Sequence, residues 1–163
     1  MFESKKDQIV SAIEGGSKEW LIEVASEIMS QAQRNTAVGR VGGGQTKASW
    51  GIGEVVDNGN ELSIEVGSTS KNALWEEYGT GDYALNGDGR KGGWYVMIGN
   101  GSNQISEEVV KAYGYRIYYG KNGKRFIHTN GKRPKRALQK AVKKTKSRAN
   151  GRLKTKIEGR LGG

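Results

Sequence analysis

Residues 50–66 read WGIGEVVDNGNELSIEV, and this stretch decides the fold class. Trp50, Ile52 and residues 54–56 predict one strand, and after a polar centre Leu62, Ile64 and Val66 alternate with polar neighbours. Alternation with a period of two is typical of a half-buried strand. The centre, Asp57-Asn58-Gly59-Asn60, supplies residues that tolerate a positive φ. The stretch therefore predicts a β-hairpin.

Upstream of the hairpin, the first 34 residues predict a helix. Apolar residues recur there at spacings near 3.6, namely Ile9, Ile13, Trp20, Val24 and Ile28. Gly15 and Gly16 interrupt the pattern and leave two alternatives: one kinked helix, or a short helix followed by a longer one capped by Ser17. A loop with three consecutive glycines, residues 36–47, then leads to the hairpin, and we expect it to be mobile.

Downstream, residues 73–78 predict a short helical or extended turn, and the Gly-rich residues 82–93 predict a second mobile loop. Three further strands are expected, over residues 94–98, 113–119 and 124–129. The last two flank the turn Lys121-Asn122-Gly123.

A short helix capped by Ser106 is expected between the first two of these strands. Pro134 is expected to open a C-terminal helix, because proline fits the first helical turn. The order predicts an α+β fold, in which a small antiparallel sheet packs against a long N-terminal helix and a C-terminal helix. We expect one domain over residues 1–148, followed by a basic, disordered tail over residues 149–163.

The 163 residues carry a formal net charge of +10, which is distributed unevenly. Residues 1–110 contain 9 Lys/Arg and 16 Asp/Glu, whereas residues 111–163 contain 18 Lys/Arg and one acid, Glu158. Such polarity can attract phosphate or an acidic protein surface. No apolar run is long enough to span a membrane and no secretory signal is evident, so we expect a cytoplasmic product.

The residues offer no catalytic constellation. With no cysteine and one histidine, His128, the chain cannot supply the several nitrogen or sulfur ligands of a zinc site. His128 also lacks a Gly-x-Ser-x-Gly partner segment. Residues 87–92 match G-x-G-x-x-G, but they precede an expected strand and not a helix, so we reject dinucleotide binding. We therefore expect no enzyme, no metal and no cofactor.

The basic C-terminal third leaves nucleic-acid binding open as an alternative function. Cations that would contact phosphate or an acidic partner lie on or beside the expected C-terminal helix, namely Lys132, Arg133, Lys135, Arg136, Lys140, Lys143 and Lys144. Nearby tyrosines could stack on bases, namely Tyr113, Tyr115, Tyr118 and Tyr119. The simpler interpretation, which we favour, is that these tyrosines alternate across a strand and the cations form a solvated face.

Three segments match the pattern of a known protein family. The first ends the loop before the hairpin and keeps Thr46, Ser49 and Trp50 of the family pattern, while its Gly and Leu are absent. The second is an aromatic–glutamate–tyrosine–glycine–threonine segment, matched by residues 75–81 with Glu77, Tyr78, Gly79, Thr80 and Gly81. The third is a Gly-x-x-Pro segment before the final helix, matched by residues 131–134 with Pro134.

In these three segments the chain resembles the tail-completion, or head–tail joining, family of long-tailed bacteriophages and prophages. The resemblance implies a minor structural protein of the virion neck that is made in the host cytoplasm. Such a protein assembles as a homo-oligomeric ring, expected to be a hexamer, and links the tail tube to the connector. Its loops, here residues 36–47 and 82–93, are expected to order against neighbouring subunits when the ring closes.

Overall fold

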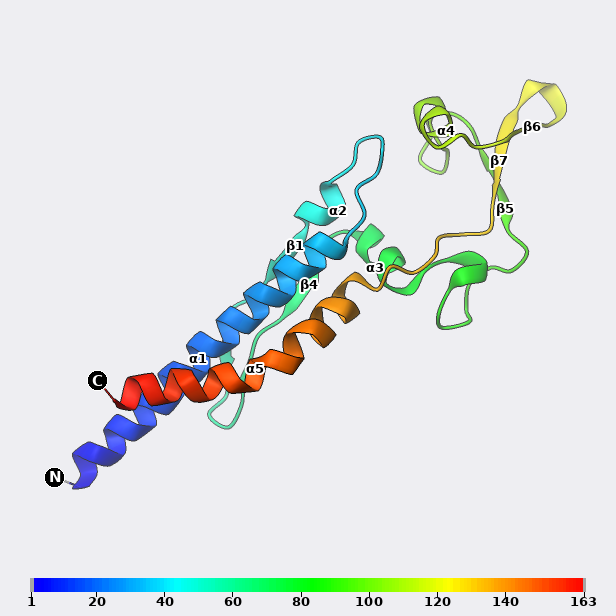
Figure 1. The fold of residues 1–163 in the computed structure, drawn as a ribbon. Coiled ribbons are helices and arrows are strands. Elements are labelled where there is room, and N and C mark those ends of the chain that lie inside the picture. The colour runs from blue at the N-terminus through cyan, green and yellow to red at the C-terminus, as the bar shows by residue number, and fades with distance from the viewer. Residues whose placement is uncertain (1, 163) are drawn as a thin grey trace. The chain divides into compact units, whose positions relative to one another are not determined.

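The computed structural model describes residues 2–162, and its contacts divide the chain into two units (Figure 1). The first unit contains the chain up to Asn35, Trp50–Thr69 and the chain from Ala137 on. The second contains Thr36–Ser49 and Ser70–Arg136. The sequence indicated one domain over residues 1–148, whereas the contacts distribute these residues between two units. The expected mixture of helices and short antiparallel strands is confirmed.

Two long helices form most of the first unit. Figure 1 shows α5 (Ala137–Leu161, orange to red) lying along α1 (Phe2–Asn35, blue). Of the two alternatives for the N-terminus the structure has one helix, which continues through Gly15 and Gly16. A Cβ added at Gly16 would lie 3.2 Å from the Ile157 side chain and 3.4 Å from its backbone. Glycine at this position therefore allows α5 to approach α1 closely.

Small side chains line the contact between α1 and α5. The buried residues of α5 recur at every fourth position, at Ala137, Ala141, Thr145 and Ala149, and three of these four are alanines. The distance between packed helices depends on the side chains at their contact, so alanines permit a short one. Trp20 adds a specific link, because its indole Nε1 donates a hydrogen bond of 2.6 Å to the carbonyl oxygen of Ala149.

The hairpin is confirmed and packs against α1. Its inner strands are β1 (Trp50–Ile52) and β4 (Val66–Ser68), and its outer strands are β2 (Val56–Asp57) and β3 (Leu62–Ser63). Both pairs are antiparallel, with Trp50 opposite Ser68 and Val56 opposite Ser63. In the turn, the Asp57 carboxylate accepts from the Gly59 N–H at 3.0 Å. Of the four turn residues expected to tolerate a positive φ, Gly59 adopts one, at 85°.

The second unit consists of a three-stranded sheet and three short helices. The antiparallel sheet has the order β5 (Trp94–Met97), β7 (Arg125–Thr129), β6 (Ile117–Tyr119). The helices are α2 (Gln45–Ala48), α3 (Lys71–Tyr78) and α4 (Glu107–Tyr113). Two single turns of 3₁₀ helix, at Gly81–Tyr83 and Lys121–Gly123, complete the unit.

The core of the second unit lies between α4 and one face of the sheet. Ile98, Val110 and Ile127 are buried there. Three half-buried residues pack against them, namely Val96, Ile105 and Ile117. The predicted cap of α4 is confirmed, because the Ser106 hydroxyl accepts from the Val109 N–H at 3.3 Å.

Three boundaries differ from the sequence prediction. α5 begins at Ala137 and not at Pro134, because Arg136 has a φ of 54°, outside the helical region. α5 then continues to Leu161, where we expected a disordered tail from residue 149. Tyr113 ends helix α4, so the strand expected over residues 113–119 is limited to β6.

Among residues 2–162, no helix is both long enough and apolar enough to cross a lipid bilayer.

Candidate functional site

The second and third sequence motifs lie side by side in the second unit. Residues 75–81 and 130–136 are joined by a short ladder of hydrogen bonds, and we call this contact the motif junction. The Thr80 N–H donates to the Lys132 carbonyl oxygen at 2.9 Å, and the Lys132 N–H donates to the Thr80 hydroxyl at 2.8 Å. The motif threonine therefore fixes the register of two segments some fifty residues apart.

Glycines allow the two backbones of the motif junction to touch. Gly81 has a φ of 61° and Gly131 a φ of 103°, values that side chains disfavour. A Cβ added at Gly81 would lie 2.3 Å from the Asn130 carbonyl oxygen, and one at Gly131 would lie 2.1 Å from the Thr80 carbonyl oxygen. No side chain fits at either position, which explains the glycines of both motifs.

Glu76 is the buried centre of the motif junction, with only 4% of its surface exposed. Its carboxylate receives a hydrogen bond of 2.7 Å from the Lys132 ammonium and one of 3.2 Å from the Ala37 N–H. Its backbone carbonyl also accepts from the N–H groups of Lys135 and Arg136. Glu76 thus ties α3 to the chain on either side of it.

The sequence analysis selected Glu77 as the motif glutamate and missed Glu76. A signal was present, because Ala73 and Glu76 are three residues apart and so share one face of a helix. Both are buried in the structure, while Glu77 is half-buried and takes part in other interactions.

The opposite side of α3 is apolar and open to solvent. Leu74, Trp75 and Tyr78 are 61%, 49% and 46% exposed, and we call these three side chains the α3 face. A shallow pocket of about 270 Å³ lies beside them, lined by Leu74, Trp75, Tyr78, Gly79, Ala84, Asn86 and Asp88. The aromatic residues of the motif therefore point outward from a helix whose other side is held by Glu76.

The first motif has a local structural role at α2. The Ser49 hydroxyl donates to the Thr46 carbonyl oxygen at 2.8 Å, and the hydroxyls of Thr46 and Ser70 lie 3.5 Å apart. Trp50, which follows in the sequence, is buried in the first unit.

Both loops that we expected to be mobile have anchors. In the first loop, the Arg40 N–H donates to the Tyr113 hydroxyl at 2.9 Å, and the Arg40 guanidinium lies over the Tyr113 ring. In the second loop, the Asp82 carboxylate accepts from Asn130 at 2.7 Å and from the Gly92 N–H at 2.9 Å. The hydrogen bond from Asn130 has the largest effect and, together with the one from Gly92, lowers the pKa of Asp82.

The seven basic residues selected from the sequence do not form one patch within either unit. Lys132, Arg133, Lys135 and Arg136 belong to the second unit, and Lys140, Lys143 and Lys144 to the first. Some are already engaged: Lys132 binds Glu76, and the Arg133 guanidinium lies 4.4 Å from the centre of the Tyr83 ring. Lys144 donates to the Gln31 side chain at 3.3 Å.

One flank of α5 is neutralised by α1. Acids at four-residue spacing on α1 meet cations at the same spacing on α5, which gives the ion pairs Glu19–Arg160, Glu23–Lys156, Glu27–Arg152 and Glu27–Arg148. Each pair is at least partly exposed and stabilises the fold modestly. Together they hold the basic end of the chain in a defined register, which explains why α5 extends to Leu161.

We predict that acid weakens the first unit. The hydrogen bond and charge of Arg160 hold the pKa of Glu19 below its usual 4.5, and Lys18 holds the pKa of Asp57 below 3.8. A carboxyl group whose pKa is lowered by folding stabilises the folded state when the pH is above its unfolded-state pKa. This stabilisation is lost as the pH falls through its folded-state pKa. The hydrogen bond to Glu23 raises the pKa of Lys156 above 10.5, so the contribution of Lys156 to stability is lost only at alkaline pH. The unfolding temperature, measured by circular dichroism, should therefore decrease when the pH is lowered below about 4.5.

A Glu19→Gln variant is the control for this prediction, because it removes one of these titrating groups. Its unfolding temperature should depend less on pH in the acid range than that of the unaltered protein. High salt should weaken the dependence in both proteins. An unfolding temperature that is constant from about pH 7 to about pH 3 would contradict the role of the ion pairs.

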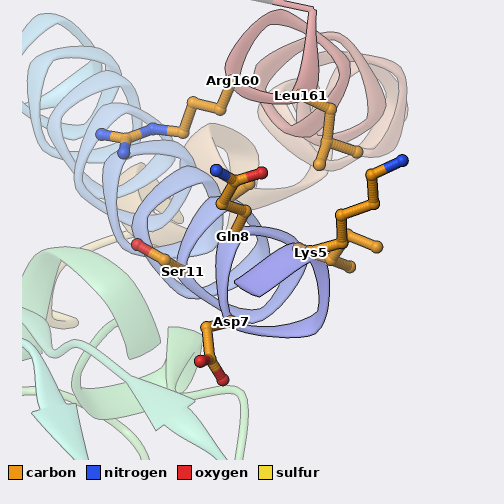
Figure 2. Close-up of a pocket in the computed structure, with 8 residues that line it drawn as sticks. Lys5, Asp7, Gln8, Ser11, Arg160 and Leu161 are labelled. Carbon is orange, nitrogen blue, oxygen red and sulfur yellow. The ribbon is translucent and has the colours of Figure 1, made fainter. Parts of the chain in front are cut away.

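A second pocket, of about 830 Å³, lies where the start of α1 meets the end of α5. Figure 2 shows Lys5 and Gln8 of α1 turned toward Arg160 and Leu161 of α5. The lining holds neither histidine nor a nucleophile paired with a base. Throughout residues 2–162, no three His, Asp or Glu side chains gather closely enough to hold a metal ion.

Comparison with known proteins gives a family match for approximately the N-terminal half of the chain. Residues 2–79 match the family model described as "Bacteriophage HK97-gp10, putative tail-component". No curated protein and no solved structure matched the chain. The matched residues span α1, the hairpin and α3, and end within the second motif at Gly79. Residues 2–79 therefore match the HK97-gp10-like family of bacteriophage tail components, as the motifs of the sequence predicted.

Proposed function

We propose that this chain is a structural virion protein of a long-tailed phage or prophage, a ring-forming tail-completion or head–tail joining subunit that links the tail tube to the connector. The family match supports a tail component. The more specific role rests on the α3 face, because two of its three residues, Trp75 and Tyr78, belong to the second family motif and remain exposed in the single chain.

The α3 face has the composition of a protein–protein contact. Contiguous exposed apolar surface is unusual on a soluble monomer and marks interaction sites. Tryptophan and tyrosine in particular are enriched among the residues that dominate binding energy. Trp75 and Tyr78 project from a helix that Glu76 fixes on its other side, so little conformational freedom is lost when a partner binds.

In this proposal the loops, residues 36–47 and 82–93, complete the contacts. The first loop is anchored through Ala37 and Arg40 and the second through Asp82 and Leu85, and each contains glycines that leave other parts of the loop adaptable. A ring of identical subunits repeats one heterologous contact, so two such surfaces per chain suffice to close it.

The test is complementation of a phage that lacks the gene. Trp75→Ala and Tyr78→Ala are each expected to weaken the contact roughly 30-fold, the effect of removing about 2 kcal/mol at a binding hot spot. Plaque titre should fall, and electron microscopy should show heads and tails that fail to join.

Glu108→Ala is the control, because Glu108 is an exposed residue of the second unit that lies on α4 and not on α3. It should complement normally. Circular dichroism of the purified variants checks that they fold. Folded Trp75→Ala and Tyr78→Ala proteins that complement as well as the control would overturn the role of the α3 face.

The ion pairs between α1 and α5 weigh against the alternative in which α5 itself binds nucleic acid. Arg148, Arg152, Lys156 and Arg160 are all paired with acids of α1. Phosphates would have to displace these partners.

A further inference from the structure

The part of the second unit that follows Gly79 lies outside the family match, and it contains a sheet with two unlike faces. One face carries Val96, Ile117 and Ile127 and packs into the core with Val110 of α4. Side chains alternate between faces along a strand, so the neighbouring residues lie on the other side.

The other face carries aromatic side chains from all three strands. Phe126 and His128 lie on the central strand β7, Tyr95 lies opposite His128 on β5, and Tyr118 lies opposite Phe126 on β6. We call these four residues the aromatic face. The Tyr95 ring meets the Tyr118 ring edge to face at 5.5 Å and the His128 ring at 5.0 Å. The rings of Tyr95, Tyr118 and His128 therefore form one continuous surface.

The aromatic face is exposed to solvent at Tyr95, and glycines flank it on two sides. Tyr95 is 60% exposed. A Cβ added at Gly93 would lie 2.6 Å from the His128 ring, and one at Gly120 would lie 2.8 Å from the Phe126 ring. Glycines thus keep side chains away from two sides of this face.

Positive charge is in excess in the part of the chain that carries the aromatic face. The Arg116 guanidinium lies over the Tyr118 ring, 5.3 Å from its centre. Residues 80–136 contain eleven Lys/Arg and only four Asp/Glu. One of these acids, Glu107, is already paired with Arg125. The excess of positive charge calls for a ligand that carries many negative charges.

We propose that the aromatic face binds single-stranded nucleic acid. Unpaired bases would stack on Tyr95 and Tyr118, while Arg116 and the neighbouring lysines would neutralise the phosphates. Aromatic side chains combined with a positively charged surface are the usual means of binding single strands without sequence preference. In a duplex the base faces are covered by neighbouring base pairs, so the rings would find no partner there.

Two features favour nucleic acid over a protein partner at this face. Protein–protein interfaces are depleted in lysine, and their charges are matched by the partner's. Across residues 80–136 the cations outnumber the acids almost three to one. A phosphate backbone supplies one negative charge per nucleotide and fits such an excess. This activity goes beyond the proposed structural role.

The test is fluorescence anisotropy of the full chain with labelled oligothymidine of about 15 nucleotides, a length within the range of known single-strand sites. Binding is expected at low salt and should weaken as salt is added. Tyr95→Ala and Tyr118→Ala should each weaken binding about tenfold, while Tyr95→Phe, which keeps the ring, should bind normally.

Tyr119→Ala is the matched control. Tyr119 is adjacent to Tyr118 and is 77% exposed, but alternation places it on the other side of the strand. It should leave binding unchanged. Lys143→Ala on α5 is a second control. It should also leave oligothymidine binding unchanged, whereas weaker binding would indicate that α5, and not the aromatic face, binds the strand.

Three results would overturn the proposal: no binding at low salt, equal affinity for duplex DNA of the same length, or the same loss with Tyr119→Ala as with Tyr118→Ala. A fourth is unchanged oligothymidine binding by Tyr95→Ala combined with failed neck assembly, which would make the aromatic face a protein contact. The proposed structural function is tested separately through the α3 face and can stand or fall on its own.

Discussion

Replacing Glu76 by alanine is expected to lower the free energy of unfolding of the second unit by about 3 kcal/mol. The change removes the carboxylate that accepts hydrogen bonds from the Lys132 ammonium at 2.7 Å and from the Ala37 N–H at 3.2 Å. Breaking a buried ion pair typically costs 3–5 kcal/mol, because the remaining charge is left unpaired. The lower end applies here, since the Lys132 side chain is 43% exposed and water can reach it. Urea unfolding, followed by tryptophan fluorescence, measures the loss.

Glu76→Gln is the control that separates charge from hydrogen bonding. Glutamine keeps an oxygen that can accept from the Ala37 N–H but removes the negative charge opposite Lys132. The free energy of unfolding of the Glu76→Gln protein should decrease by less than that of the Glu76→Ala protein. A Glu76→Ala protein with the same urea midpoint as the unaltered chain would show that the motif junction does not depend on this carboxylate.

Local patterns predicted the elements that local physics controls. The hairpin followed from alternation around Asp57-Asn58-Gly59-Asn60, and the structure pairs Val56 with Ser63 across this turn. The cap at Ser106 likewise requires only a hydroxyl and an N–H three residues away. Such features are confined to a few consecutive residues, so a single sequence contains all of the information.

The end of α5 could not be predicted, because it depends on partners distant in the sequence. Residues 149–161 look disordered when their cations are considered alone. In the structure, Arg160 and Lys156 meet Glu19 and Glu23, which lie well over a hundred positions away. A single sequence contains both sets of charges but does not state that they meet.

The motif junction was predictable in part. The sequence indicated residues 75–81 and 131–134 separately, as family motifs and not as contacts. Their hydrogen bonds and the burial of Glu76 emerge only when the chain brings them together. The aromatic face was missed for a related reason, since we expected a strand to begin at Tyr113 and attached the four tyrosines to it. Only Tyr118 lies on the aromatic face, beside Tyr95 from another strand.

Gly81→Ala is expected to destabilise the second unit by about 3 kcal/mol or more, through two effects that act together. The φ of Gly81 is 61°, where a side chain costs about 1–2 kcal/mol. The added Cβ would also lie 2.3 Å from the Asn130 carbonyl oxygen and 2.8 Å from the Trp94 ring. A carbonyl oxygen in the backbone cannot move aside as a flexible side chain can, so the motif junction must open.

Gly87→Ala isolates the first of these two effects. Gly87 has a similar φ of 74°, but nothing lies within 4 Å of an added Cβ. Its loss should therefore be about 1 kcal/mol, the cost of the left-handed conformation alone. The difference between the two variants in urea unfolding then measures the close approach of residues 81 and 130. If both variants lose the same small amount, the two motif segments do not touch in solution, and the glycines of the motifs serve only to turn the chain.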